Sequence, residues 1–522
     1  MQKFTDVYLE KAEAAYKQRC EKVLADCGDD WVKLQKAFLD MIDEYMDVEV
    51  KKDINLNIHT HEAGGQFRIA FPHLLVRKND KSIKYLEDTV YARRKWTDAN
   101  QFHGYVDCHE VHHEIETYIY YQMPLYYLGF PGAEQAAKNI IDVAEHVGNW
   151  VDGVPDWYNW ETHSFVSNWL GTKGVRAYPP YDYQEGNHFR FTDCAMCACH
   201  ITKDPRYLDL ICDYCAAWCD HIEKLAAKGE VISCSILPEA AKILERNKAG
   251  VNLGETSVYE IFYSLAADNT MYDIAGGLLD AYFVSDNMRF RAAAELLIDQ
   301  FVANGNSGRP ALQFTKGKWV TVGDEGFDGK FICDCTFIAR LALRHHQMTG
   351  SEKYKAIIMS WAASIDEENN SYDQMMANVL VAAHYFDGDS KWLARAYKMA
   401  LRVWATSEHI DDYHQCAWSG KRQGTKFLME MLYQPMLGDV DWGTRGNIPK
   451  LLFRHVTNGE MTLPTGVAFR SYMISQNEFA FEAVNTSGAK ADWSIASVCG
   501  STAFAEISLE PGESKKGSFS IK

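Results

Sequence analysis

The sequence has little proline and few basic residues for its size. Its 522 residues include 13 Pro, and 53 Lys and Arg stand against 71 Asp and Glu, which gives a formal charge of −18. Scarce proline favours helix, because proline interrupts the hydrogen bonds of a helix interior. The negative charge argues against sequence-independent binding to nucleic acid or to an anionic membrane, since both depend on many cations. A small anionic substrate is still compatible with a local basic pocket.

Long apolar runs and several common motifs are also missing. No window approaches the run of about 18 apolar residues that a membrane-spanning helix needs. Residues 1–20 carry charges throughout, unlike a secretory signal, so the 14 Cys are typical of reduced thiols in a cytosolic protein. Phosphate-loop, dinucleotide-fingerprint and nucleophile-elbow motifs are absent. We expect a cytoplasmic protein with no cofactor and no nucleic-acid or membrane partner; a homo-oligomer is compatible with the sequence.

A helical pattern recurs along most of the chain. A turn, an aromatic residue and an amphipathic helix follow one another at 203–215, 285–297, 350–362 and 388–400, and a copy without the aromatic lies at 131–143. Apolar helical runs rich in small residues precede these copies, at about 113–128, 192–202, 272–284, 335–348 and 372–386. Small side chains let helix backbones approach closely, which predicts an inner ring wrapped by an outer one. With segments near 6–49 and 424–434, about six hairpins complete a circle.

The pattern changes after about residue 445, where apolar and polar residues alternate. Short strands are expected at 471–476, 478–485, 492–498, 503–509 and 517–522, separated by turn signals such as Pro511-Gly512. The sequence therefore predicts a mainly α protein with a helical ring over residues 1–440 and a β-sandwich over residues 441–522.

The predicted architecture resembles a known superfamily. A ring of helical hairpins with outer helices opened by phrases such as Asp204-Pro205-Arg206-Tyr207-Leu208, followed by a β-sandwich, is similar to the (α/α)6 toroid carbohydrate-active enzymes. These include six-hairpin glycoside hydrolases, such as β-glucuronidases and unsaturated glucuronyl hydrolases, and toroidal polysaccharide lyases. The resemblance covers most of the chain and concerns architecture. It implies chemistry on sugars, often uronic acids, in the mouth of the ring where the inner helices begin.

Acidic residues stand at the expected starts of the inner helices. Glycoside hydrolysis needs one protonated carboxyl for the leaving oxygen and one ionised carboxylate as base or nucleophile. Asp273 and Asp334 are our preferred pair for these catalytic roles. Tyr372 and Asp373 repeat the pairing of Tyr272 with Asp273, in which an aromatic beside the acid supplies a sugar platform or an acid partner. The competing interpretation is helix capping, because Asp accepts hydrogen bonds from free backbone N–H groups.

The segment EGNHFRF at 185–191 favours a second chemistry. Asn187 and His188 are similar to the Asn-His pair with which toroidal lyases neutralise a uronate and assist proton abstraction. β-Elimination needs a base, a group that tempers the carboxylate and an acid, roles that His188, Arg190 and Tyr272 can fill. A glucuronidase can use the same His and Arg to hold the substrate carboxylate. A loop-packing histidine beside a solvated arginine is the alternative.

Aromatic residues and histidines crowd the stretch 157–169. Sugar rings stack on aromatic faces while polar groups hold their hydroxyls, so a glycan-binding interpretation suits Trp157, Trp160, His163 and Trp169. Buried aromatics that anchor a long loop are the alternative. We assign Trp160 and His163 to substrate binding.

One histidine-rich segment raises the question of a metal. Residues 109–113, HEVHH, match the metalloprotease helix, in which two histidines one turn apart bind zinc. No clear third ligand follows, and charged residues crowd the pattern. We therefore favour His109 and His113 as sugar contacts, with no metal expected, although zinc stays open.

Four cysteines form a double C-x-x-C pattern that zinc sites also use. Both pairs fall within expected helices, where a spacing of three marks one helix face. Buried free thiols are therefore favoured over a metal site. The residues are Cys194, Cys197, Cys212 and Cys215.

These patterns together predict a glycoside hydrolase that acts on uronic-acid-containing oligosaccharides or glucuronides. A β-eliminating uronate lyase on the same fold is the second interpretation. A sugar epimerase and a non-catalytic glycan-binding protein are further alternatives. Elimination creates an unsaturated product that absorbs in the ultraviolet, whereas hydrolysis adds water, so one assay separates the first two.

Overall fold

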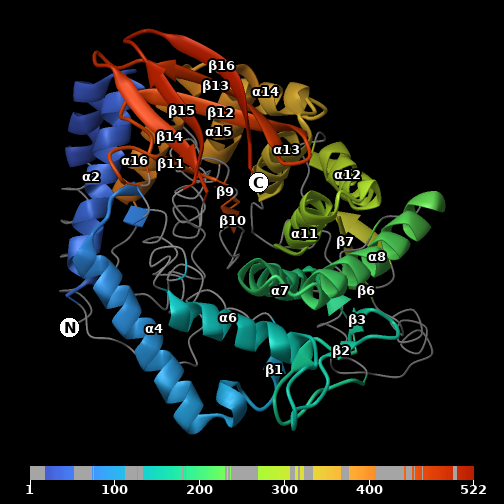
Figure 1. Cartoon of the computed structure of the whole chain (residues 1–522). Helices are drawn as coiled ribbons and strands as arrows, with labels where there is room; N and C mark the ends of the chain where they lie inside the picture. The colour runs from blue at the N-terminus through green and yellow to red at the C-terminus, as the bar shows by residue number, and fades with distance from the viewer. Residues whose placement is uncertain are drawn as a thin grey trace, which may run out of the picture.

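A computed structural model describes the chain in several stretches. These are residues 18–51, 73–111 except 75, 126, 133–229 except 179, 180 and 183, 232, 235–236, 269–305, 312–315, 318–321, 333–365, 376–406, 440–441, 450–451, 453–497 except 461, and 502–521. Within them the chain is mainly helical, with a small β-sheet region toward the C-terminus (Figure 1). None of the described helices has the length and apolar composition to cross a membrane.

The predicted hairpins appear as consecutive helices. In sequence order the pairs are α7 (Phe189–Thr202) with α8 (Arg206–Ala227), α11 (Asn269–Ser285) with α12 (Met288–Gly305), α13 (Cys333–Thr349) with α14 (Lys355–Ser364), and α15 (Met376–Asp387) with α16 (Lys391–Thr406). Helix α6 (Glu134–Val147) matches the copy without the aromatic, and α2 (Trp31–Glu49) and α4 (Asp80–Asn100) precede it. The expected helices at 424–434 and, apart from one residue, at 113–128 lie outside the described residues.

The recurring turn has a physical basis in helix termination and capping. Lys203, Asp286, Gly350 and Gly388 each adopt a left-handed backbone, with φ of 62°, 57°, 67° and 78°, just after an inner helix ends. A polar side chain then caps the next helix. The oxygens that accept from backbone N–H groups belong to Asp204 (from Arg206, 3.0 Å), Asn287 (from Arg289, 3.1 Å) and Asp389 (from Lys391, 2.9 Å).

The first helices of the hairpins pack on one another in sequence order. Helix α7 contacts α11, α11 contacts α13, and α13 contacts α15, while α8 contacts α12 and α16 contacts α2. In Figure 1 these helices follow one another along an arc. The arrangement agrees with an inner layer wrapped by an outer one. Closure of the arc into a six-hairpin toroid stays a prediction.

The C-terminal region forms two three-stranded antiparallel sheets. One has the order β11 (Arg454–Val456), β14 (Ala491–Ala496), β15 (Ala503–Leu509), and the other β12 (Val467–Ser475), β13 (Glu478–Asn485), β16 (Ser514–Ser520). The predicted strands are confirmed. The sheets pack face to face, because Phe453 at the start of the first sheet lies 4.9 Å from Phe519 and 5.7 Å from Phe479 of the second, between ring centroids.

Short antiparallel ladders occur in the connections. The pairs are β1 (His109–Glu110) with β4 (Trp169–Leu170), β2 (Tyr158–Asn159) with β3 (Ser164–Phe165), β5 (Gln184–Glu185) with β6 (Ser235–Ile236), β7 (Leu312–Thr315) with β8 (Lys318–Thr321), and β9 (Val440–Asp441) with β10 (Lys450–Leu451). Two 3-10 turns, η2 (Phe102–Gly104) and η3 (Gly186–His188), complete the elements named here.

Strand β12 and the turn that follows it contact the C-terminal parts of three inner helices. Gln476 donates to the carbonyl of Phe283 near the end of α11 (2.6 Å), and Arg470 donates to the carbonyl of Tyr385 near the end of α15 (3.0 Å). Between them, the rings of His346 on α13 and Tyr472 lie 5.3 Å apart. The N-terminal ends of these helices therefore lie at the end that β12 does not cover.

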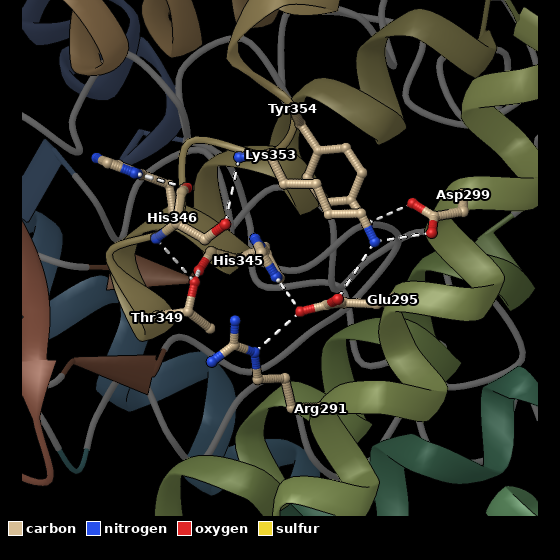
Figure 2. Close-up of polar contacts among 9 residues, drawn as sticks. Arg291, Glu295, Asp299, His345, His346, Thr349, Lys353 and Tyr354 are labelled. Carbon is tan, nitrogen blue, oxygen red and sulfur yellow. Dashed lines mark hydrogen bonds and ion pairs between the residues drawn. The ribbon is translucent and has the colours of Figure 1, made fainter.

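A polar cluster ties α12 to α13 and to the start of α14 (Figure 2). The Glu295 carboxylate accepts from Arg291 Nε (2.9 Å), contacts His345 Nε2 (2.8 Å) and accepts from Lys353 Nζ (3.2 Å). Lys353 also donates to Asp299 at 2.7 Å. These contacts join an outer helix to its neighbouring hairpin.

Candidate functional site

The N-terminal parts of α7 and α11 bring an arginine and an aspartate together. Arg190 Nε lies 3.0 Å from Asp273 Oδ2, and each side chain is 1% exposed. The packing depends on Gly277, where a Cβ atom would lie 2.2 Å from the ring of Phe189. Because Gly277 has no side chain, the start of α7 can approach α11 closely. Two predicted site residues, one from each of the two chemistries, thus form one ion pair.

The pair favours a particular protonation state. An arginine at hydrogen-bond distance stabilises the ionised carboxylate, and the low dielectric of a buried site strengthens that attraction. An ionised carboxylate serves as base or nucleophile rather than as general acid. Capping does not explain Asp273, because α11 already begins at Asn269, a full turn earlier.

A second cation lies against the neighbouring tyrosine. The guanidinium carbon of Arg340, on α13, lies 5.0 Å from the centroid of the buried Tyr272 ring. Further toward the C-terminal ends of the same two helices, Arg344 on α13 forms a buried ion pair with Asp280 on α11. Buried charges are costly unless they are paired, so these contacts join α11 to α13.

His188 is bonded to the backbone on both sides of its ring. Nε2 lies 3.0 Å from the Ser167 carbonyl, so it donates there, and Nδ1 accepts from the Glu185 N–H at 3.2 Å. Burial lowers the pKa of His188 to about 4, which keeps the ring neutral. A general base needs a lone pair directed at the substrate proton. In this geometry His188 instead anchors the loop around Ser167 to the start of α7.

The side chains of Asn187, Trp160 and His163, which were predicted to bind substrate, form polar contacts within the protein. Asn187 Nδ2 donates to Glu185 Oε1 at 2.8 Å. Trp160 Nε1 donates to the Gly148 carbonyl at 3.1 Å, and His163 Nδ1 lies 3.5 Å from Asp213 on the outer helix α8. These contacts agree with the alternative in which aromatic residues anchor the loop.

Some predicted residues are only partly described or not described. Asp334 lies in the first turn of α13, and its side chain lies outside the described part. His113, Tyr372 and Asp373 also lie outside the described residues. Their assignments therefore stay predictions.

The metalloprotease interpretation of HEVHH conflicts with the local backbone. His109 and Glu110 form strand β1, in which His109 pairs with Leu170 of β4. The zinc motif requires a helix that carries both histidines, and a strand does not present residues spaced by four in that way. The His109 ring instead stacks on Trp169, with 5.5 Å between centroids.

The double C-x-x-C pattern lies within helices α7 and α8. None of its four thiols forms a disulfide. Burial raises the pKa of Cys194 and of Cys212, which favours protonated thiols, whereas zinc binds thiolates. Among the residues that the structure describes, no three His, Cys, Asp or Glu side chains gather as a metal site.

Sequence reasoning missed Arg340 and Ser167. Arg340 and Arg344 are spaced by four within an apolar, Ala-rich inner helix, and such charges need buried partners. That pattern could have identified Arg340. No pattern identified Ser167, because its role depends on loop geometry rather than on spacing.

A comparison of this chain with protein-family models, curated proteins and solved structures gives no significant match.

Proposed function

We propose that the protein is a glycoside hydrolase acting on uronic-acid-containing oligosaccharides or glucuronides, with its hairpins closed into an (α/α)6 toroid. The observation that carries this proposal is the buried pair of Arg190 and Asp273. It lies in the first turns of α7 and α11, and in α11 this is the end opposite to the one that the β12 region contacts. A toroidal carbohydrate enzyme would use that end as its active site.

The residues can be given roles in hydrolysis. Asp273, kept ionised by Arg190, acts as nucleophile or as the base that activates water. Asp334, in the first turn of α13, supplies the protonated carboxyl for the leaving oxygen. Arg190 carries several donors, and Arg340 adds positive charge beside Tyr272, so the site suits a sugar that bears a carboxylate.

The uronate lyase has less support than the hydrolase. Its base would be His188, yet both ring nitrogens of His188 face backbone partners in the neutral tautomer. Elimination through this residue would require the bond from the Glu185 N–H to Nδ1 to break first, because that bond uses the only lone pair of the neutral ring. The hydrolase needs no such rearrangement, because Arg190 at 3.0 Å favours the ionised form of Asp273.

The first experiment is an incubation with uronic-acid oligosaccharides and nitrophenyl uronides, followed by mass and by ultraviolet absorbance. Hydrolysis predicts products that gain one water without new absorbance. New absorbance without added water would indicate elimination instead. If neither the mass nor the absorbance changes, both enzyme assignments are contradicted for these substrates.

Asp273→Asn tests the role of the pair, and Asp280→Asn is its matched control. Each substitution removes the carboxylate from a buried Arg–Asp pair on α11, so each is expected to cost about 3–5 kcal/mol of stability. Only Asp273→Asn should lower kcat, by at least about a hundredfold, at a temperature where both variants are folded. Equal activity in the two variants would mean that the Arg190–Asp273 pair only joins helices.

A further inference from the structure

An arginine in the loop at 167–182 packs against two neighbouring aromatic rings. The guanidinium carbon of Arg176 lies 4.0 Å from the centroid of the Trp169 ring and 4.9 Å from that of Tyr181. A cation–π contact uses a face of a guanidinium and leaves in-plane N–H groups available as donors. The two ring centroids lie 5.7 Å apart, so the rings are neighbours on the guanidinium rather than one on each side of it.

One serine bonds to the backbone of this loop at three points. Ser167 Oγ lies 2.8 Å from the Arg176 carbonyl and 2.9 Å from the Tyr181 carbonyl, and it accepts from the Trp169 N–H at 2.8 Å. The carbonyl of the same serine accepts from His188 at 3.0 Å. His188 immediately precedes α7, two residues before Arg190, so the loop that holds Arg176 is tied directly to the candidate site.

Arg176 differs from Arg206, another arginine stacked on aromatic rings, because it has no acidic partner among the described residues. Arg206 lies over Trp150 at 4.4 Å, and its guanidinium also pairs with Glu145 and Asp204. Arg176 forms no ion pair with any carboxylate, and its side chain donates no hydrogen bond, within the part of the chain that is described. A rigid guanidinium with open in-plane donors matches the geometry of a carboxylate.

An exposed aromatic ring packs on Tyr181, one of the two rings that contact this cation. Tyr178 is 54% exposed, and its ring lies 5.7 Å from that of Tyr181 in an edge-to-face arrangement. An exposed ring can pack against the apolar face of a sugar. The loop thus offers both parts that recognition of an acidic sugar requires: a fork for the carboxylate and a ring for the pyranose.

We propose that Arg176, packed against Trp169 and Tyr181, forms a subsite that binds the carboxylate of a uronic acid residue in the oligosaccharide. This inference rests on the proposed function, because it names a contact of the same substrate. Tyr178 packs against the sugar ring. The subsite selects acidic over neutral oligosaccharides without taking part in bond cleavage.

The test compares two ligands and a matched pair of variants. Binding of a hexuronic acid trimer and of its carboxyl-reduced neutral counterpart is measured by calorimetry for the wild type, Arg176→Gln and Lys173→Gln. Lys173 is a suitable control because it is an exposed cation of the same loop, paired with Asp107 at 3.0 Å. Arg176→Gln should weaken the acidic trimer about tenfold or more, since a charge-assisted bond is lost. The neutral trimer should change less than about twofold, and Lys173→Gln should leave both unchanged.

Two controls show whether weaker binding by Arg176→Gln comes from misfolding: thermal unfolding of each variant, and the binding affinity of Arg176→Lys. Lysine keeps the charge but not the planar fork, so its affinity for the acidic trimer should be intermediate. The inference is overturned if Arg176→Gln binds the acidic trimer as the wild type does, if it weakens both ligands equally, or if the wild type binds neither. Cleavage of the trimer is followed in the same samples. Binding through Arg176 without cleavage would refute the hydrolase alone, and cleavage with unchanged affinity in Arg176→Gln would refute the subsite alone.

Discussion

Buried histidines in this protein differ in whether their rings have polar partners. His384, near the end of α15, contacts the Asp389 carbonyl through Nδ1 at 3.2 Å. His455, on β11, packs 4.4 Å from the Phe469 ring and has no hydrogen-bond partner for either ring nitrogen among the described residues. Burial lowers the pKa of His455 to about 3. It behaves as an apolar core residue that carries two unsatisfied polar atoms.

His455→Leu is therefore expected to stabilise the protein by about 1 kcal/mol, because an unsatisfied polar group is replaced by an apolar one of similar size. His384→Leu is the matched control and should destabilise by about 1 kcal/mol, since it leaves a carbonyl without its partner. Denaturant unfolding measures both. A loss of stability in His455→Leu would show that its ring has a polar role.

At the residue scale, the sequence indicated candidate functional side chains but not which of them contact each other in the folded protein. Asp273 and Arg190 were both predicted, in separate roles. Their pairing depends on the close approach of α7 and α11 at Gly277, which spacing along the chain does not reveal. His188 was predicted as a base because its neighbours resemble a motif. Its two backbone bonds are set by loop geometry that no local pattern encodes.

At the scale of elements, the cluster around Glu295 determines how α12 is held to the next hairpin. Its hydrogen bonds with His345 and Arg291, and those with Lys353, hold the pKa of Glu295 well below its usual value despite partial burial. The folded state therefore favours the ionised carboxylate. Its stabilising contribution is complete above the unfolded pKa near 4.5 and declines as the pH falls below that value.

Glu295→Gln should destabilise the protein by about 1.5–3 kcal/mol at pH 7, because charge-assisted bonds are lost. The difference from the wild type should shrink between pH 4.5 and lower pH, where the wild-type carboxylate loses the same contribution. Glu352→Gln provides the control, since Glu352 is 60% exposed and pairs only with Lys355 among the ion pairs seen. Its effect should stay below about 0.5 kcal/mol. Equal effects in the two variants would contradict a special role for Glu295.

Elements were predicted better than their boundaries. The hairpins and strands follow from apolar periodicity and from turn residues that cap helices, both of which are local properties. Helices α7 and α11 begin at Phe189 and Asn269, three residues before the expected starts at 192 and 272. That small shift moves Asp273 out of the capping position and into the second turn. Boundaries depend on tertiary contacts, so sequence periodicity defines them poorly.

On the scale of the whole molecule, several buried neutral histidines act together. Burial lowers the pKa of His188 and of His384 to about 4 each and that of His455 to about 3, from 6.5 in an unfolded chain. At a pH between the folded pKa of each histidine and 6.5, that histidine binds a proton in the unfolded chain but not in the folded chain. Stability is therefore full above pH 6.5 and is lost as the pH falls.

The free energy of unfolding is expected to fall by up to about 4 kcal/mol per pH unit between pH 6 and pH 4, from three groups at about 1.4 kcal/mol each. Urea unfolding across this range measures the slope. In His455→Leu the slope should decrease by about 1.4 kcal/mol per pH unit, which is the contribution of one histidine. A flat profile from pH 7 to pH 5 would contradict neutral burial of these residues.

The position of β12 along the chain has a consequence for how the protein is made. Ribosomes build the chain from its N-terminus, so α11, α13 and α15 emerge before the strand that covers their ends has been synthesised. Until Arg470 and Gln476 arrive, the carbonyls of Tyr385 and Phe283 lack these partners, and the surface around His346 is open to other chains. A nascent chain thus completes this part of its helical core only when translation has reached the sheet.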